Sequence, residues 1–171
     1  GTRPYGGPER EDLLSGYLPL FYRVFPQAAE RLMPRAFEEA DGAVMCAAVA
    51  DYTPDRVSDT KIKKCDGDMC ITLRRTRDIA AELGARKGGR LLVGFALETH
   101  DEEAHAEAKL TKKNFDFIVL NSLRDKGAGF SGDTNKITVI DRQGHTDEYP
   151  LEAKTAAAER IAERIEKFFA E

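Results

Sequence analysis

The sequence predicts an α/β domain with a largely parallel sheet, followed by a C-terminal hairpin and helix. Three apolar runs of strand length carry this prediction: Gly42–Ala50, Leu91–Ala96 and Phe115–Leu120. They lack the polar and apolar alternation of half-exposed strands and are typical of strands covered on both faces. Segments with the apolar spacing of helices separate these runs. Strands that alternate with helices imply right-handed crossovers and parallel pairing.

The chain before the first apolar run is less regular. Residues 1–16 contain several glycines and prolines, which indicates a loop or a poorly ordered arm. Leu18–Phe25 is apolar and aromatic, and it fits either a short strand limited by nearby prolines or a buried segment. In Gln27–Ala40 apolar residues recur at helical spacing, and Pro34 is expected to break or kink this helix.

The remaining elements follow from the same signals. They are a strand at Met69–Leu73, a helix at Arg77–Leu83 that stops near Gly84, a helix at Asp101–Lys113, and a hairpin with strands Ile137–Ile140 and Asp147–Tyr149. From Leu151 onward a closing helix is expected to pack on the sheet, because apolar residues recur at helical spacing: Ala157, Ile161, Ile165 and Phe168.

Composition excludes several classes of protein. The 171 residues are enough for one domain with a substantial core, so we expect residues 1–171 to form a single domain. A formal net charge of −4 argues against a general nucleic-acid binder. No apolar run approaches the roughly 20 residues of a membrane span and no signal peptide opens the chain, so no membrane association is expected. Three cysteines, an odd number, favour a reduced, cytoplasmic protein.

One stretch, Cys46–Lys64, has the features of a ligand site. Four small apolar residues allow a ligand to approach the backbone where the expected strand ends at Asp51, and open α/β sheets bind ligands at the carboxyl ends of their strands. Lys61, Lys63 and Lys64 follow on a loop long enough to act as a lid. Each piece also has an ordinary interpretation, as a turn acid and a solvated basic loop. The three histidines form no catalytic or metal-binding motif, and surface positions are expected for them.

Five motifs occur in a fixed order: AAVADY, KIKK, VGFALET, KKNFDFIVLN and GAGFSGDTN. Together they make the chain from Asp41 to about Phe168 resemble phosphopantothenoylcysteine synthetase, the second enzymatic half of the bacterial coenzyme A biosynthesis flavoprotein. The resemblance implies a Rossmann-like three-layer domain. It also implies a ligase that joins 4′-phosphopantothenate to L-cysteine, with CTP as the activating substrate and an acyl cytidylate as the intermediate.

The resemblance further implies partners and a metal. Mg²⁺ would bridge the triphosphate, and no flavin is expected in this chain. Family members are homodimers, and Arg56–Lys64 is the candidate for the strap that contributes to the partner's site. A flavin-dependent decarboxylase is expected as a partner or as a fused domain.

Several site residues carry over from the family by their motifs. Asp51 would bind CTP and its metal, and Lys61, the first lysine of KIKK, would bind nucleotide and support catalysis, since a lysine can neutralise growing negative charge. The cytosine base would be recognised by the segment Arg77, Asp78, Ile79 and Ala80. The family usually has Asn-Pro-Asp-Ile there, whereas Thr76 and Arg77 replace Asn-Pro in this chain. Asp78 also fits a plain acid at the start of a helix.

The other carried-over residues have strong structural alternatives. Phe95 would line the base or sugar pocket, but core packing is the common role of a phenylalanine. Lys109 and Lys113 match CTP-contacting positions and share a helix face, yet they also fit a solvated face paired with glutamates. Asn121 ends a strand and would serve the pocket by hydrogen bonding. The Gly-rich loop Lys126–Asn135 resembles a loop near the family's active site.

The N-terminal part is where the chain departs from the family. In the family a GGTREPID-type turn and an SNxSSGxMG segment precede the matched region, and the asparagine of the second acts on the acyl cytidylate. Only Gly1, Thr2 and Arg3 are similar to the first, and residues 1–40 show no counterpart of the second. The alternative function is therefore a nucleotide-binding or dimer-forming module of the same fold without full catalysis.

Overall fold

The computed structural model describes residues 26–47, 49–64, 66–98, 101–122 and 133–170. The chain divides into two compact units. The hairpin unit contains Ala47–Asp78 and the chain up to Met33, and the sheet unit contains Pro34–Cys46 and Ile79–Glu171. The segments predicted at residues 1–16 and Leu18–Phe25 lie outside the described residues.

The sheet unit is built on one five-stranded sheet with the strand order β1-β4-β5-β7-β8. Its strands are β1 (Gly42–Met45), β4 (Leu91–Glu98), β5 (Phe117–Ser122), β7 (Ile137–Asp141) and β8 (Thr146–Glu148). The first three are parallel, whereas β7 is antiparallel to β5 and β8 to β7. The predicted α/β fold with a parallel sheet and a C-terminal hairpin is therefore confirmed.

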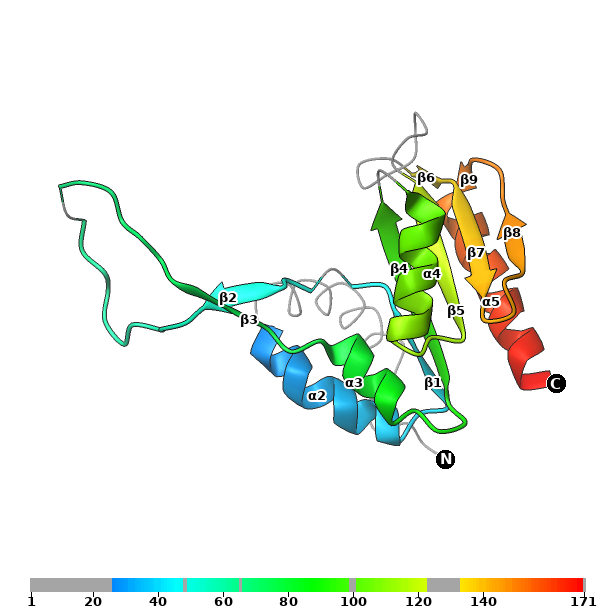
Figure 1. Cartoon of the computed structure of the whole chain (residues 1–171), viewed down its shortest axis with the longest axis horizontal. Helices are drawn as coiled ribbons and strands as arrows, with labels where there is room; N and C mark the ends of the chain where they lie inside the picture. Colours follow the sequence, from blue (N-terminus) through cyan, green and yellow to red (C-terminus); the bar gives the residue numbers. More distant parts are fainter. Residues whose placement is uncertain (1–25, 48, 65, 99–100, 123–132, 171) are drawn as a thin grey trace, which may run out of the picture. The chain divides into compact units, whose positions relative to one another are not determined.

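Helices cover both faces of this sheet, which makes three layers (Figure 1). α5 (Lys154–Ala170) covers one face, where Ala157, Ile161 and Ile165 pack on alternate strand residues such as Val93 and Val119. The strand residues between them face the other side, since successive side chains of a strand alternate. That side is covered by α4 (Glu102–Lys112) and α3 (Ile79–Ala85), through the buried residues Ala106, Leu110, Ile79 and Leu83. The predicted closing helix is confirmed.

Gly94 makes close packing possible on the α4 side of the sheet. An added Cβ at this position would lie 2.4 Å from the ring of Phe115, which is itself 3% exposed. The ring therefore occupies the space that a side chain would need. The glycine of the VGFALET motif is accordingly explained by packing.

The predicted strand Gly42–Ala50 is too long. β1 ends at Met45, and Val44 is 40% exposed, so this strand is not covered on both faces by the described residues. Within the described part of the chain β1 pairs only with β4, and the alanine-rich segment that follows has little β propensity and little area to bury. Asp51 therefore does not end a strand of the five-stranded sheet.

The C-terminal hairpin is confirmed, with small shifts at its ends. Gly144 has φ +80, the left-handed region that a tight turn requires and glycine adopts without strain. An unpredicted ladder lies nearby, where β6 (Thr134–Asn135) pairs antiparallel with β9 (Glu152–Ala153) just before α5.

The first helix, α2 (Pro26–Glu38), is confirmed, but the predicted break at Pro34 is wrong. The helix continues through this proline, which is buried, and Phe37 one turn later is 3% exposed. A proline costs a helix one backbone hydrogen bond, and burial of these side chains offsets that cost. The division between the two units falls at this proline.

The hairpin unit contains β2 (Tyr52–Pro54) and β3 (Leu73–Arg75), which pair antiparallel with Thr53 opposite Arg74 and are joined by a long loop (Figure 1). The predicted strand Met69–Leu73 is therefore wrong, because the paired residues begin where it was expected to end. Thr76 closes the base of the hairpin: its N–H donates to the carbonyl of Asp51 (3.0 Å) and its hydroxyl to that of Ala50 (2.7 Å).

A buried ion pair stabilises the end of the sheet at which β4 and β5 begin. Lys87, 5% exposed, donates to Oδ1 of Asp116 at 2.5 Å, and the N–H of Leu92 donates to Oδ2 of the same carboxylate at 2.8 Å. Burial lowers the pKa of Lys87, and the bond to Asp116 opposes this shift. Removing either partner alone would leave a charge buried without compensation.

Candidate functional site

Polar side chains gather where β4 and β5 end in the sheet unit. The register places Asn121 of β5 beside Leu97 of β4, and Asn121 Nδ2 lies 3.5 Å from Oδ1 of Asn135. Oδ1 of Asn121 is buried and accepts no hydrogen bond from the described residues. A buried acceptor without a donor costs about 1–3 kcal/mol. This oxygen is therefore well placed to accept a hydrogen bond from a ligand.

Glu152 supplies a second acceptor of this kind. It pairs with Asn135 in the β6 and β9 ladder, and its Oε1 is buried without a donor among the described residues. Sequence reasoning missed this residue. Its only local signal is an acid two residues before a helix, and that is also the signal of an ordinary helix start.

Phe95 lies on the α5 face of β4 and is half-buried. It packs against the core cluster that includes Val93 and Val119. Phe95 therefore serves as a core side chain that is only partly covered. A role in a base pocket stays a prediction.

Lys109 and Lys113 lie at the end of α4, and the N–H of Lys113 donates to the carbonyl of Lys109 at 2.9 Å. The helix returns from the end of β4 to the start of β5, so its last turn lies toward the amino ends of the strands (Figure 1). The N–H of Phe115 donates to Leu110 there. The two lysines share one turn, as expected, but they lie on the opposite face of the sheet from Phe95. Their contact with nucleotide stays a prediction.

Asp51 belongs to the hairpin unit, where it is exposed and directly precedes β2. The hydrogen bonds from Thr76 fix the backbone on both sides of its amide, while its carboxylate points into solvent. An exposed carboxylate on a fixed backbone is suited to bind a metal or a sugar hydroxyl.

Lys61 lies in the loop between β2 and β3 and is exposed. Close by, the Ser58 hydroxyl donates to the carbonyl of Thr60 (2.7 Å) and accepts from its N–H (3.3 Å), which makes a local turn. The loop is therefore held at one point beside the lysine. A catalytic role for Lys61 stays a prediction.

The four residues expected to read the base divide between the units. Arg77 and Asp78 are exposed and precede α3, and the N–H of Arg77 donates to Oε1 of Glu30 at 3.2 Å. The predicted helix start at Arg77 is thus two residues too early. Ile79, 4% exposed, begins α3 and belongs to the core, and Ala80 is half-buried.

The described ranges contain neither a metal-binding cluster nor a membrane-spanning helix. No three or more His, Cys, Asp or Glu side chains there are grouped so that they could hold a metal ion. No helix in those ranges is long and apolar enough to cross a membrane. His105 and His145 are exposed, as predicted, and His100 lies outside the described residues.

Comparison with known proteins gives consistent matches. The chain is 45% identical over 129 residues to the coenzyme A biosynthesis bifunctional protein CoaBC of Bacillus subtilis, which covers 75% of this chain and 32% of the relative. It is 54% identical over 131 residues to a cysteine/cysteine sulfinic acid decarboxylase of an unidentified prokaryote, which covers 76% of this chain and 36% of the relative. The chain thus spans about a third of the length of the curated relatives it matches.

Solved structures agree with these matches. The crystal structure of the C-terminal domain of CoaBC has a TM-score of 0.68 and 33% identity, and the match covers 84% of this chain and 62% of that one. A Cab2 variant in complex with phosphopantothenate-cysteine shares the fold, with a TM-score of 0.55 and 19% identity. The family model described as DNA/pantothenate metabolism flavoprotein C-terminal domain matches residues 27–169. The resemblance to phosphopantothenoylcysteine synthetase is thereby confirmed, and the chain belongs to the family of this flavoprotein C-terminal domain.

Proposed function

We propose that the chain is a ligase of coenzyme A biosynthesis that joins 4′-phosphopantothenate to L-cysteine at the expense of CTP. The observation that carries the proposal is the match to the C-terminal domain of CoaBC over 84% of the chain. The buried, unpartnered oxygen of Asn121 supports it, because that atom lies where open α/β sheets take their ligands.

The reaction has two displacements. A carboxylate oxygen of 4′-phosphopantothenate attacks the α-phosphorus of CTP, and pyrophosphate leaves to give an acyl cytidylate. The cysteine amine then attacks the acyl carbon, loses its proton and expels CMP. Both steps bring anions together, so positioning and charge neutralisation supply most of the catalysis.

The side chains take different parts in this scheme. Lys61 neutralises charge that grows on the carboxylate and the α-phosphate, and its place on a solvent-exposed loop allows it to close after the nucleotide has docked. Asp78 recognises the cytosine base, and Phe95 supplies an apolar wall. Asn121 accepts a hydrogen bond from a nucleotide hydroxyl or amine.

Mg²⁺ fits the donor set. Magnesium bound to phosphates commonly takes few protein carboxylates, and the described residues offer single acids such as Asp51 in place of a cluster. Asp51 would hold the ion, which would supply charge neutralisation on the triphosphate when bound.

Further expectations concern assembly and compartment. We propose a homodimer in which Arg56–Lys64 reaches the partner, since Val57 and Ile62 in this strap are 84% and 65% exposed. A flavin-dependent decarboxylase is the expected fused or associated partner. The exposed free thiols of Cys46 and Cys70 suit the reducing cytoplasm.

Two other functions are distinguishable. The 54% identity to a cysteine sulfinic acid decarboxylase favours a role in a protein of that activity, although the match covers 36% of that relative. The second alternative is a module that binds nucleotide or dimerises without catalysis.

The test follows each product separately. With CTP, Mg²⁺ and 4′-phosphopantothenate but no cysteine, the protein should release pyrophosphate, and added cysteine should yield CMP and the coupled product. ATP should replace CTP poorly. Tight CTP binding without pyrophosphate release would leave the binding module, and carbon dioxide released from cysteine sulfinic acid would favour the decarboxylase.

A further inference from the structure

Two side-chain oxygens of the described residues are buried without a hydrogen-bond donor: Asn121 Oδ1 and Glu152 Oε1. Both belong to the sheet unit. Buried polar side-chain atoms are nearly always hydrogen-bonded, so each exception needs an explanation. Glu152 needs one more than Asn121 does, because a carboxylate carries charge and its side chain makes no ion pair or hydrogen bond with the described residues.

The backbone pairing brings these two acceptors into one group. Asn121 Nδ2 lies 3.5 Å from Oδ1 of Asn135, and Asn135 is directly opposite Glu152 in the β6 and β9 ladder. Side chains directly opposite each other in an antiparallel pair point to the same face, with Cβ atoms about 4.5–5.5 Å apart. Asn135 therefore neighbours both Asn121 and Glu152, and we call these three residues the acceptor group.

The acceptor group lies at the carboxyl end of the sheet, on the face that α5 covers. The register places Asn121 opposite Ile137, which belongs to the core cluster on that face. Phe95 packs against the same cluster. The half-buried ring and the acceptors thus share one face at the strand ends where open α/β sheets take their ligands.

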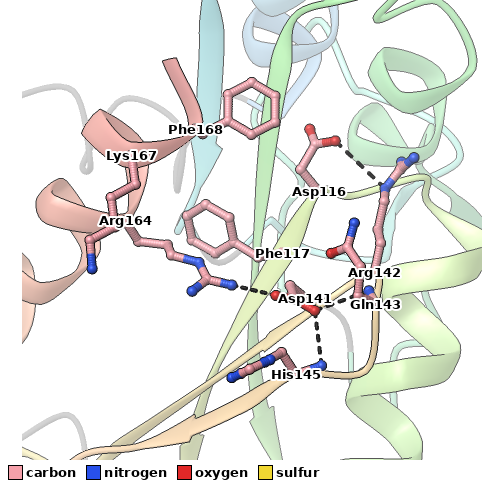
Figure 2. Close-up of a pocket in the computed structure, with 9 residues that line it drawn as sticks. All are labelled: Asp116, Phe117, Asp141, Arg142, Gln143, His145, Arg164, Lys167 and Phe168. Atoms are coloured by element: carbon pink, nitrogen blue, oxygen red, sulfur yellow. Dashed lines mark hydrogen bonds and ion pairs between the residues drawn. The ribbon is translucent and has the colours of Figure 1, made fainter. Parts of the chain in front are cut away.

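The acids at the opposite end of β5 have partners within the protein. They line the pocket drawn in Figure 2, where Asp141 pairs with Arg164 and also accepts from two backbone N–H groups of the following turn. Asp116 accepts from the ammonium of Lys87. Each of these carboxylates has a cation supplied by the protein, whereas the described residues supply none to Glu152.

The covered oxygens belong to residues that are only half-buried. Asn121, Asn135 and Glu152 are all of this kind, so part of each residue is in contact with solvent. The terminal torsions of amide and carboxylate side chains have broad minima. A small rotation of either group is therefore enough to turn its unused oxygen toward a bound ligand.

The chemistry of the acceptors selects the ligand group. Two acceptors, one of them a carboxylate, disfavour the phosphates of a nucleotide and favour a cation with several donors. An ammonium has three donors and no acceptor, and hydrogen bonds between ionised groups are roughly twice as strong as neutral ones. A ribose diol also offers two donors, but it would leave the carboxylate without a counter-charge.

From this combination we infer that Glu152, together with Asn121, binds the ammonium group of the amino-acid substrate. The inference rests on the proposed function, in which cysteine is the substrate that carries a cationic group. The amine attacks the acyl group of the cytidylate, so its subsite has to lie next to the nucleotide. The Asn121 oxygen has two lone pairs with which to serve both. Glu152 thereby selects an amino acid over a thiol that lacks the amine.

A kinetic test compares the two substrates of the coupled reaction. Glu152→Gln keeps the size of the side chain and removes its charge. It should raise the KM for cysteine at least about tenfold and change the KM for CTP by less than about twofold. Glu152→Asp, which restores the charge on a shorter side chain, should recover part of the loss. Glu159→Gln, at an exposed glutamate of α5, is the matched control and should change neither KM.

A binding test decides the inference without any turnover. The ¹⁵N-labelled protein is titrated with L-cysteine, with N-acetyl-L-cysteine, whose nitrogen carries no charge, and with cytidine. L-Cysteine should give saturable amide shifts at Asn121, Asn135 and Glu152, with a dissociation constant in the millimolar range. Glu152→Gln should weaken this binding at least about fivefold, and N-acetylation should weaken it by at least as much.

The outcomes separate this inference from the proposed function. Amine-dependent binding of cysteine without pyrophosphate release would remove the ligase and keep the subsite. Normal pyrophosphate release with an unchanged KM for cysteine in Glu152→Gln would keep the ligase and overturn the subsite. The inference is also overturned by absent shifts, by equal binding of the two thiols, or by shifts with cytidine alone, which would assign the acceptors to the ribose diol.

Discussion

The sheet unit and the hairpin unit bury their apolar side chains to different extents. Val93 and Val119 in the sheet are 0% exposed, whereas Val57 and Ile71 in the loop between β2 and β3 are 84% and 60% exposed. A two-stranded hairpin has no core and is marginally stable alone. The sheet unit is therefore specified by its own packing, and the hairpin unit depends on what its exposed side chains contact.

The largest difference between the two units is expected when the same kind of substitution, Asp→Asn, is made in each. Asp116→Asn in the sheet unit keeps an acceptor for the Leu92 N–H but leaves the Lys87 charge buried without its partner. We expect a loss of about 3–5 kcal/mol in the free energy of unfolding. Asp68→Asn in the exposed loop should change it by less than about 0.5 kcal/mol. Urea unfolding measures both.

A second variant shows whether the loss comes from the buried charge. Lys87→Met with Asp116→Asn removes both charges, and buried pairs are often replaced by apolar side chains without loss. The double variant should recover most of the stability. Equal instability of the single and double variants would contradict this account.

The second largest effect is expected on the rate of catalysis, from a residue of the hairpin unit. Lys61→Gln keeps a polar side chain but removes a charge that acts mainly in the transition state. Pyrophosphate release should slow at least about a hundredfold, or ~2.7 kcal/mol, with a much smaller change in CTP affinity and none in unfolding. Lys63→Gln, two residues on, should slow the reaction by less than about tenfold. Near-normal release by Lys61→Gln would leave it an ordinary loop lysine.

A smaller effect tests the lysines of α4. If Lys109 and Lys113 hold phosphates, each change to alanine should weaken CTP binding by about 1.5–3 kcal/mol, as charged hydrogen bonds do. Lys112→Ala, in the same turn but at an exposed position, is the control. Titration calorimetry decides: a change of only about 0–1 kcal/mol at all three positions would assign them to the solvated surface.

The smallest effect on stability is expected in the strap. Val57→Ser with Ile62→Ser should change the free energy of unfolding of the monomer by less than about 0.5 kcal/mol, because both side chains are exposed. The same change should weaken the proposed homodimer in sedimentation equilibrium. Leu151→Ser, at an exposed leucine of the sheet unit, should leave assembly unchanged. Unaltered dimers in the first variant would remove the strap from the interface.

The sequence predicts most accurately the strands that can be recognised from their own continuous apolar residues. Leu91–Ala96 and Phe115–Leu120 were placed within two residues of β4 and β5, since their apolar runs are long enough to require cover on both faces. β6 and β9 were missed because two paired residues have no periodicity. Their pairing depends on where the chain returns before α5.

The sequence predicted only those parts of the candidate site that lie next to a recognisable apolar run. The amide of Asn121 was expected because it ends an apolar run, and the structure adds that its Oδ1 is buried without a donor among the described residues. Glu152 was missed because it reaches this amide only through the ladder with Asn135. The position of Lys109 relative to Phe95 required the direction and the face of α4, which helical spacing alone does not give.

Gly94 and Phe115 constrain each other in this chain. Because the ring fills the space of a Cβ at position 94, the two positions should vary together: a relative with alanine or a larger residue at the first should have a smaller side chain than phenylalanine at the second. The glycine of the VGFALET motif would then indicate that an aromatic ring packs between the sheet and the α4 layer. Its presence in a sequence would be explained by this packing and would not by itself indicate a catalytic role.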